Sequence, residues 1–275
     1  MRFDKVILAG ATPITLFDHK NPRSTPYTTR TIDGLGPTEV NVALAQNLEG
    51  GGLYIGRRPQ LREITVNASL NPDYTIGQTP EKLREDIYRL VPVNRDRSLD
   101  FCLLLNGEEL AITPVYVKRV DVSPFSKDTL FQIVLASTSE YFYKRVPLLD
   151  EAPNFNTLNP NFVNVGSAPT GFRVRVRFTG AATQFGFYRY DLPDRMLVTY
   201  NFQTNDILEI NTNQGSRGVW LTRGGVMTSL IGNLSTDSTW LVLESGDNPF
   251  VTFVGIGAPQ FTWQQFEYRP KYLGV

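Results

Sequence analysis

Residues 32–91 read IDGLGPTEVNVALAQNLEGGGLYIGRRPQLREITVNASLNPDYTIGQTPEKLREDIYRLV, and this stretch decides the fold. It joins a turn-rich beginning, two strands on either side of a glycine loop, and the one convincing helix of the sequence. The second strand alternates regularly, because residues 64, 66, 68 and 70 are apolar whereas residues 63, 65, 67 and 69 are polar. This period of two is typical of a strand with one buried face.

A short helix is predicted over residues 80–91. Thr79 is a suitable N-cap, Pro80 takes the first helical position, where its missing N–H does no harm, and Glu81 suits the positive end of the helix dipole. The apolar residues at 83, 87, 90 and 91 share one side of the helix, and a proline at 92 ends it. We therefore expect one amphipathic helix to lean on a sheet in a chain that otherwise consists of strands.

The first half of the chain predicts an antiparallel sandwich or partial barrel. Asn106 and Gly107 separate two apolar runs, and this pair favours a type I′ hairpin turn because both residues tolerate positive φ. Consecutive strands joined by turns indicate antiparallel pairing. Further strands are expected at residues 5–9, 40–45, 53–55, 99–105, 115–122 and 130–136.

Prolines and asparagines interrupt the alternation over residues 146–170. We therefore predict a first domain of residues 1–148, a linker of residues 149–170 and a second domain of residues 171–275. Turn-separated strands with the spacing of a β-sandwich follow, at residues 172–178, 185–190, 197–202, 207–210, 218–221, 240–243, 250–254 and 261–268. The expected fold class is all-β: a β-sandwich with one short helix, followed by a second β-sandwich.

Several phrases of the sequence carry a resemblance to a known family. In the first half they are DGLGPTEV, IGRRPQLREI and LNPDYTIGQTPEKLREDIY. In the second half they are NVGSAPTGFRVRVRFTG, NDILEINT, STWLVLESGDNPFVTF and FTWQQFEYRPKYLGV. Together these phrases resemble the distal tail proteins of long-tailed, siphovirus-type phages.

The resemblance implies an architecture and an assembly. The first domain would form a hexameric ring that is coaxial with the tail tube, and the second would be a galectin-like or carbohydrate-module-like sandwich. In some relatives the final strand returns to the first domain, which leaves the place of residues 271–275 open.

Composition excludes several classes of protein. Lys+Arg and Asp+Glu each number 27 in the 275 residues, so net charge gives no reason to expect binding to nucleic acids or anionic membranes. Cys102 is the only cysteine and lies in an apolar run, so we expect a buried thiol and no intramolecular disulfide. No segment has the apolar length of a signal peptide or of a membrane span. We expect a protein that is made in the cytoplasm of the host.

No pattern predicts catalysis, a metal or a cofactor. His19 is the only histidine, it lies in a polar stretch with prolines, and no G-x-S-x-G motif is present. The sequence also lacks H-E-x-x-H, Cys-x-x-Cys and EF-hand patterns. The glycines at 50–52 precede no G-K-[ST] and open no helix, which disfavours a nucleotide site. We expect no enzyme, and a glycan-cleaving one is the weakest alternative, because no pair of acids stands out.

Three sets of residues are candidates for interaction. Contacts between subunits are expected at a flexible loop and the planar guanidiniums that follow it, namely Gly50, Gly51, Gly52, Arg57, Arg58 and Arg62. A solvated strand face, or a peripheral salt-bridge surface between subunits, is expected at Arg173, Arg175 and Arg177. Sugar rings could stack on Trp220, Tyr188 and Tyr190, whereas Trp240 and Trp263 are expected in the core.

Together with the resemblance, these observations predict a structural virion protein of the phage tail tip. Its ring would lie between the tail tube protein above and a hub or tip protein below, and DNA would pass through it only as cargo. Its periphery would be a platform for fibres or host-contact proteins. The alternative is a carbohydrate-binding module that attaches the phage to sugars of the host surface.

Overall fold

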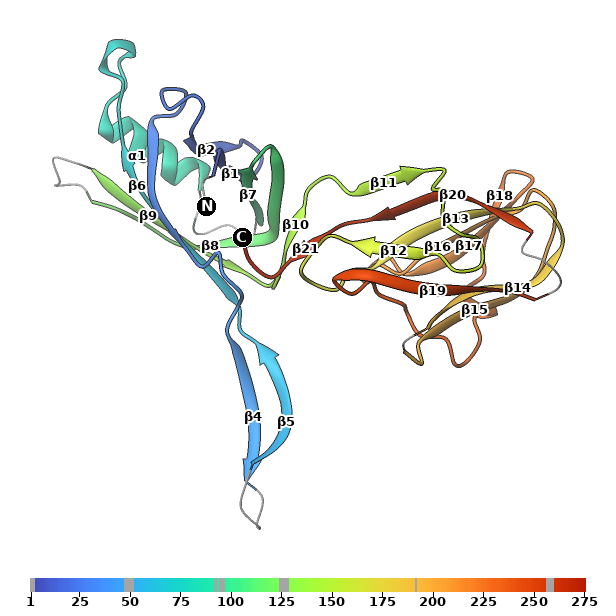
Figure 1. Ribbon diagram of the computed structural model, residues 1–275. Coiled ribbons are helices and arrows are strands. Elements are labelled where there is room, and N and C mark those ends of the chain that lie inside the picture. The colour runs from blue at the N-terminus through green and yellow to red at the C-terminus, as the bar shows by residue number, and fades with distance from the viewer. Residues whose placement is uncertain are drawn as a thin grey trace. The chain divides into compact units, whose positions relative to one another are not determined.

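The computed structural model describes residues 3–46, 52–91, 93, 97–123, 129–190, 192–255 and 260–275. The chain divides into two compact units (Figure 1). The first unit consists of Met1–Arg145 and Tyr272–Val275, and the second of Val146–Lys271.

The first unit is built on a nine-stranded sheet (Figure 1). Seven strands follow the order β2-β1-β7-β8-β9-β6-β3, and β10 and β21 pair beside this path. The pairings along the path are antiparallel, as the turn-linked pattern predicts. The strands are β1 (Lys5–Ala9), β2 (Ile14–Asp18), β3 (Tyr27–Asp33), β6 (Arg62–Leu70), β7 (Leu99–Leu105), β8 (Glu108–Val122), β9 (Leu130–Ser137), β10 (Phe142–Lys144) and β21 (Lys271–Tyr272).

One helix, α1 (Pro80–Leu90), packs on this sheet after the 3-10 turn η1 (Tyr74–Ile76). The hydroxyl of Thr79 accepts a hydrogen bond from the backbone N–H three residues later, which is the predicted N-cap. Leu83 and Ile87 are buried in one core with the inward side chains of the sheet, such as Ile64. The prediction of an all-β chain with one short α-helix is confirmed for the described part of the chain.

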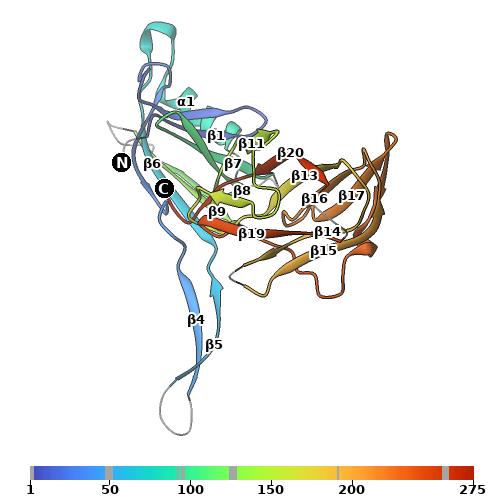
Figure 2. The same cartoon turned by 45° about the vertical axis from the view of Figure 1, so that its right-hand side comes forward.

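A two-stranded hairpin leaves the sheet of the first unit. It consists of β4 (Val40–Gln46) and β5 (Gly52–Pro59), which pair with each other and form a sheet of their own. Both ribbon views show it reaching away from the nine-stranded sheet (Figures 1 and 2).

The second unit is a sandwich of two antiparallel sheets. The six-stranded sheet has the order β11-β20-β13-β16-β17-β18, and the four-stranded sheet has the order β12-β19-β14-β15. Phenylalanines from both sheets fill the space between them; the rings of Phe178 and Phe202, for example, stack at 4.4 Å. The strands are β11 (Leu148–Glu151), β12 (Asn161–Asn164), β13 (Phe172–Phe178), β14 (Ala182–Arg189), β15 (Arg195–Phe202), β16 (Ile207–Asn211), β17 (Gly218–Arg223), β18 (Val226–Ser229), β19 (Gly246–Val254) and β20 (Phe261–Tyr268), with the 3-10 turn η2 at Ile231–Asn233.

The segment expected to be a linker, residues 149–170, belongs to the second unit. β11 pairs with β20, and β12 pairs with β19. Phe162 of β12 is fully buried in the core, and Phe155 packs against that core. Two four-residue strands separated by proline-containing turns are too short to show alternation, and this is why the segment resembled a linker.

The last four residues lie in the first unit. The N–H of Val275 donates to the carbonyl of Leu35 at 3.0 Å. Tyr272 and Val275 also pack against the core of that unit. The chain therefore closes its first unit only after it has completed the second.

Candidate functional site

Several exposed apolar side chains of the first unit lie on the β4–β5 hairpin. Those of Val40, Val42, Leu44, Tyr54 and Ile55 are between 42% and 65% exposed. The hairpin pairs along its length, with Leu44 opposite Tyr54 and one irregularity next to Leu44. A two-stranded hairpin is marginally stable in water unless something packs against it. Its exposed apolar side chains are therefore suited to contact with another molecule.

Three of the predicted contact residues lie on β5 of this hairpin. Gly50 and Gly51 lie outside the described residues. Gly52 begins β5, where Arg57 pairs with Val42, and the side chain of Arg58 is exposed. These positions agree with a contact role but do not test it.

Arg62, in contrast, is not a surface residue. Its side chain is 3% exposed, and its guanidinium donates four hydrogen bonds of 2.6–2.9 Å to backbone carbonyls. The guanidinium also lies 4.8 Å from the centre of the Phe142 ring. Burial lowers the pKa of Arg62. The expectation of a subunit contact at Arg62 is therefore corrected, because this side chain joins segments within the first unit.

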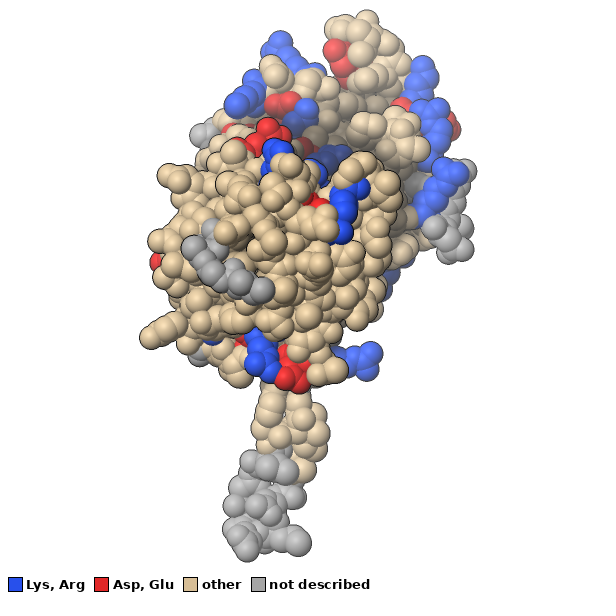
Figure 3. Space-filling model, turned by 90° about the vertical axis from the view of Figure 1, so that its right-hand side faces the viewer, with Lys and Arg blue, Asp and Glu red and all other residues tan. Residues whose placement is uncertain are grey.

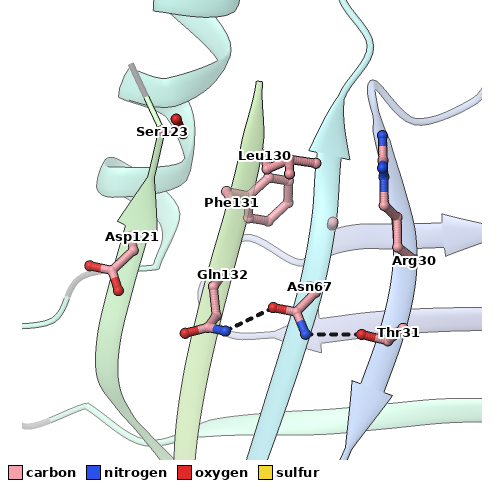
Figure 4. A pocket seen from close by; sticks show the side chains of 9 residues that line it. Arg30, Thr31, Asn67, Asp121, Ser123, Leu130, Phe131 and Gln132 are labelled. Carbon is pink, nitrogen blue, oxygen red and sulfur yellow. Dashed lines mark hydrogen bonds between the residues drawn. The ribbon is translucent and has the colours of Figure 1, made fainter. Parts of the chain in front are cut away.

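A ladder of polar side chains crosses the face of the nine-stranded sheet that turns away from the core (Figure 4). Gln132 of β9 donates to Asn67 of β6 at 2.8 Å, and Asn67 donates to Thr31 of β3 at 2.9 Å. Arg119 of β8 extends the ladder by donating to Gln132 at 2.6 Å. A hollow of about 480 Å³ lies over these strands. Amides, a hydroxyl and a guanidinium that satisfy one another brace a sheet. The carboxylate of Asp121, which also lines the hollow, is paired with Arg119 at 2.8 Å.

The three arginines of β13 are engaged within the second unit. Arg173 binds Glu209 through two parallel hydrogen bonds of 2.9 Å, which raise the pKa of Arg173. Arg175 lies 3.5 Å from the same carboxylate, and Arg177 donates to Asn205 at 2.6 Å. Because these arginines already have polar partners in their own unit, the geometry favours a solvated strand face over a salt-bridge surface between subunits.

The aromatic candidates for sugar stacking do not come together. Tyr188 lies on β14 of the four-stranded sheet and Tyr190 just beyond it, and both are exposed. Trp220 lies on β17 of the six-stranded sheet, where its ring covers Gly218. Trp263 is buried in the core, and Trp240 packs against that core, as expected.

A hollow of about 540 Å³ beside Tyr188 includes a residue that the sequence analysis missed. Phe253 of β19 is exposed there, and Leu192 and Arg195 also line the hollow. The guanidinium of Arg195 pairs with Asp237. The alternation of β19 puts Phe253 on the outer face, but the pairing of β19 with β14 has no signal in the sequence.

The described residues show no arrangement for a metal. Among them, no group of three or more His, Cys, Asp or Glu side chains could hold a metal ion. Cys102 is buried, and burial raises the pKa of its thiol to about 12. None of the described helices is long and apolar enough to span a membrane.

Comparison with known proteins places the second unit in a family. Residues 165–272 match the family model of the siphovirus-type tail component, C-terminal domain. These residues belong to the siphovirus tail-component family. The second unit therefore carries the C-terminal domain of a siphovirus-type tail component, and the place of the protein is the virion. No curated protein matches the chain.

Solved structures extend the likeness of this tail component to the whole fold. The Dit protein (gp 19.1) of phage SPP1, described as a paradigm of the hub adsorption apparatus of phages that infect Gram-positive bacteria, has a TM-score of 0.68 at 14% identity. The alignment covers 97% of this chain and 98% of the Dit chain, so both units share that fold.

Two baseplate structures of phage P2 match less well. In the activated baseplate with Ca the TM-score is 0.48 at 11% identity, with 100% of both chains covered. In the baseplate with Sr it is 0.45 at 10% identity, with 98% of this chain and 99% of the other covered. With TM-scores below 0.5, these two structures support no conclusion about this chain.

Proposed function

We propose that this tail component forms a closed ring of six subunits at the tip of the phage tail, with the β4–β5 hairpin as a contact between neighbouring subunits. The observation that carries the proposal is the row of exposed apolar side chains on a hairpin without a third strand. Because the hairpin would meet a different surface on the next subunit, the contact is head-to-tail, and such a contact gives a ring when the rotation from one subunit to the next closes.

The energetics of the hairpin support a permanent contact. Burying a Val, Leu or Ile side chain completely is worth about 1.5–3 kcal/mol. Four aliphatic side chains and Tyr54 are partly exposed on the hairpin, so covering them contributes several kcal/mol for each subunit. Arg58 adds a guanidinium that can pair with a carboxylate of the neighbour.

The ring would join the tail tube to the hub or tip proteins, and the second unit would offer a peripheral platform for fibres or host-contact proteins. Membership of the tail-component family and the shared fold support this role. The role requires shape, closure and stable contacts rather than catalysis. DNA would pass through the ring only as cargo.

Native mass spectrometry and negative-stain microscopy test the ring. We expect six copies for the parent protein and monomers for Leu44→Asp, because a carboxylate in an apolar contact is desolvated without a partner. The matched control is Leu149→Asp, which changes another half-exposed leucine outside the hairpin. The proposal fails if the parent is monomeric, or if Leu44→Asp assembles as the parent and the control do.

The hollow beside Tyr188 favours a second candidate function, the binding of neutral sugars. Exposed aromatic rings, here Tyr188 and Phe253, supply flat apolar surfaces, and Arg195 supplies a planar donor whose charge is already paired. A glycan array would detect retention that Tyr188→Ala and Phe253→Ala abolish. Trp220→Ala is the control, since Trp220 lies on the other sheet, and an array without any retained glycan rules the candidate out.

A further inference from the structure

In the described part of the chain, β18 is an open edge of the six-stranded sheet. Its four residues are all exposed, and the side chains of Val226 and Met227 are each 68% exposed. It pairs with β17 on one side in an unbroken register, and the order of the sheet ends with it. A short turn at Gly224 and Gly225, both with positive φ, joins the two strands.

The backbone groups of β18 that face outward can be assigned. The N–H of Leu230 donates to the carbonyl of Val219, so the pair 219–230 is hydrogen-bonded. Hydrogen-bonded and non-hydrogen-bonded pairs alternate in antiparallel sheets, so the pairs 221–228 and 223–226 are hydrogen-bonded as well. The N–H and C=O groups of Met227 and Ser229 therefore point away from β17, toward the free edge.

Two other edges of this unit show protection that β18 lacks. β11 carries Asp150 and Glu151, and charges on an edge discourage pairing with other chains. The edge of β15 is covered, because Ser235 N–H donates to Leu197 C=O and Thr239 N–H donates to Arg195 C=O. β18 has no charge, no proline and no bulge. Such an edge is a ready template for another strand.

The segment that contains β18 carries no charge. Residues 224–236 contain no Asp, Glu, Lys or Arg. Arg223, just before the turn, is neutralised by Asp206 through bonds of 2.6 and 2.8 Å. Figure 3 views this end of the second unit and shows a broad surface with few charged atoms. If an uncharged segment bound at this edge, neither the segment nor β18 would bury a charged group without a partner.

We propose that β18 receives an extended, uncharged segment of a second tail protein, which adds a seventh strand to the sheet. Main-chain hydrogen bonds to Met227 and Ser229 would align the segment about 5 Å from β18. The small side chain of Ser229, opposite Trp220, leaves room for a bulky apolar or β-branched side chain on the outer face. Four residues give a weak site, and several copies on one assembly would strengthen it by avidity.

The probe for this site is a capped, dye-labelled peptide of six alternating threonines and valines, added to the intact chain. Fluorescence anisotropy should report saturable binding, and the exchange of the Met227 and Ser229 amide hydrogens should slow. Met227→Pro removes one outward N–H but no bond to β17, and Met227→Lys adds a charge to the edge. Each should weaken binding by about tenfold or more, which corresponds to about 1.4 kcal/mol. Thr204→Lys, which adds the same charge to the exposed β15–β16 turn, should leave binding unchanged.

Three results would overturn the proposal. One is the absence of binding up to about 1 mM, the weak end of the affinity scale. Another is binding that both Met227 variants retain at the level of the parent. The third is self-association of the parent that Met227→Lys abolishes, which would identify a second copy of the chain as the occupant. The site does not depend on the hairpin, so Leu44→Asp should bind the probe like the parent whether or not a ring forms.

Discussion

A single guanidinium, that of Arg62, joins three distant segments of the first unit to β6. Its partners are the carbonyls of Gly34 and Gly36 after β3, of Glu140 before β10, and of Leu273 near the chain end. Arg62→Met should lower the free energy of unfolding by about 3 kcal/mol, because four partly buried hydrogen bonds to backbone carbonyls lose their charged donor. Urea denaturation measures this loss.

Arg58 provides the matched control for that experiment, since it is exposed. Arg58→Met should change the free energy of unfolding of the single subunit by no more than about 0.5 kcal/mol. If both variants were equally stable, water would be replacing the guanidinium of Arg62, and its role as a junction would have to be abandoned.

Asp206 makes the second unit sensitive to acid. Burial alone would raise the pKa of Asp206, but hydrogen bonds from the side chain of Arg223 and the N–H of Gln203 outweigh burial and lower it. A carboxylate with a lowered pKa stabilises the fold above its unfolded pKa, near 3.9, and loses that contribution as the pH falls through its folded value. The free energy of unfolding should therefore decline below about pH 4.

The variant Asp206→Asn tests this dependence in urea denaturation at several pH values. It should be less stable than the parent at neutral pH and should decline less between about pH 4 and pH 2. An equal acid dependence in both proteins would assign the effect to other carboxylates.

At the scale of elements, the short strand β12 contributes a central side chain to the core of the second unit. Phe162 at its centre is fully buried, and its ring stacks on that of Phe266 at 4.6 Å. Phe162→Ala should lower the free energy of unfolding by about 3–5 kcal/mol, whereas the neighbouring half-exposed Val163→Ala should cost far less. Thermal unfolding followed by circular dichroism compares them, and a similar melting temperature for both variants would mean that β12 is only loosely attached.

The sequence predicts long elements well and short ones poorly. β13 and β6 alternate over seven and nine residues, and α1 has both a cap and an apolar stripe, so local pattern suffices for them. β11 and β12 have four residues each, which is too few for a period to show. Their place depends on pairing with β20 and β19, about a hundred residues away in the chain.

The same difference between local and long-range signals decides which site residues could be predicted from the sequence. Side chains two residues apart in a strand share one face, so Arg62 lies on the same buried face of β6 as Ile64. The sequence therefore contained a signal that Arg62 is buried. The hairpin was also predictable, because two strand patterns flank a glycine run. That Tyr188 and Trp220 lie on different sheets was not predictable, because the order of strands in a sandwich has no local signature.

At the scale of the whole molecule, each end of the chain contributes to the first unit. Deleting residues 272–275 removes the Leu273 carbonyl and the hydrogen bond from Val275 to Leu35. We expect faster amide hydrogen exchange in β6 and unchanged exchange in β13, measured by mass spectrometry. Leu273→Ala, which keeps the carbonyl, is the control, and faster exchange confined to the second unit would contradict the division of the chain.

This return of the chain has a consequence for biosynthesis. The ribosome makes the second unit, roughly 130 residues, between the two parts of the first, which takes about 6–25 s at 5–20 residues per second. Throughout that delay the nascent first unit lacks the tail that Arg62 holds, so its fold is unfinished. A polypeptide that terminates early never completes the unit that carries the hairpin. We therefore expect truncated products to lack the closure that the last residues give to the first unit.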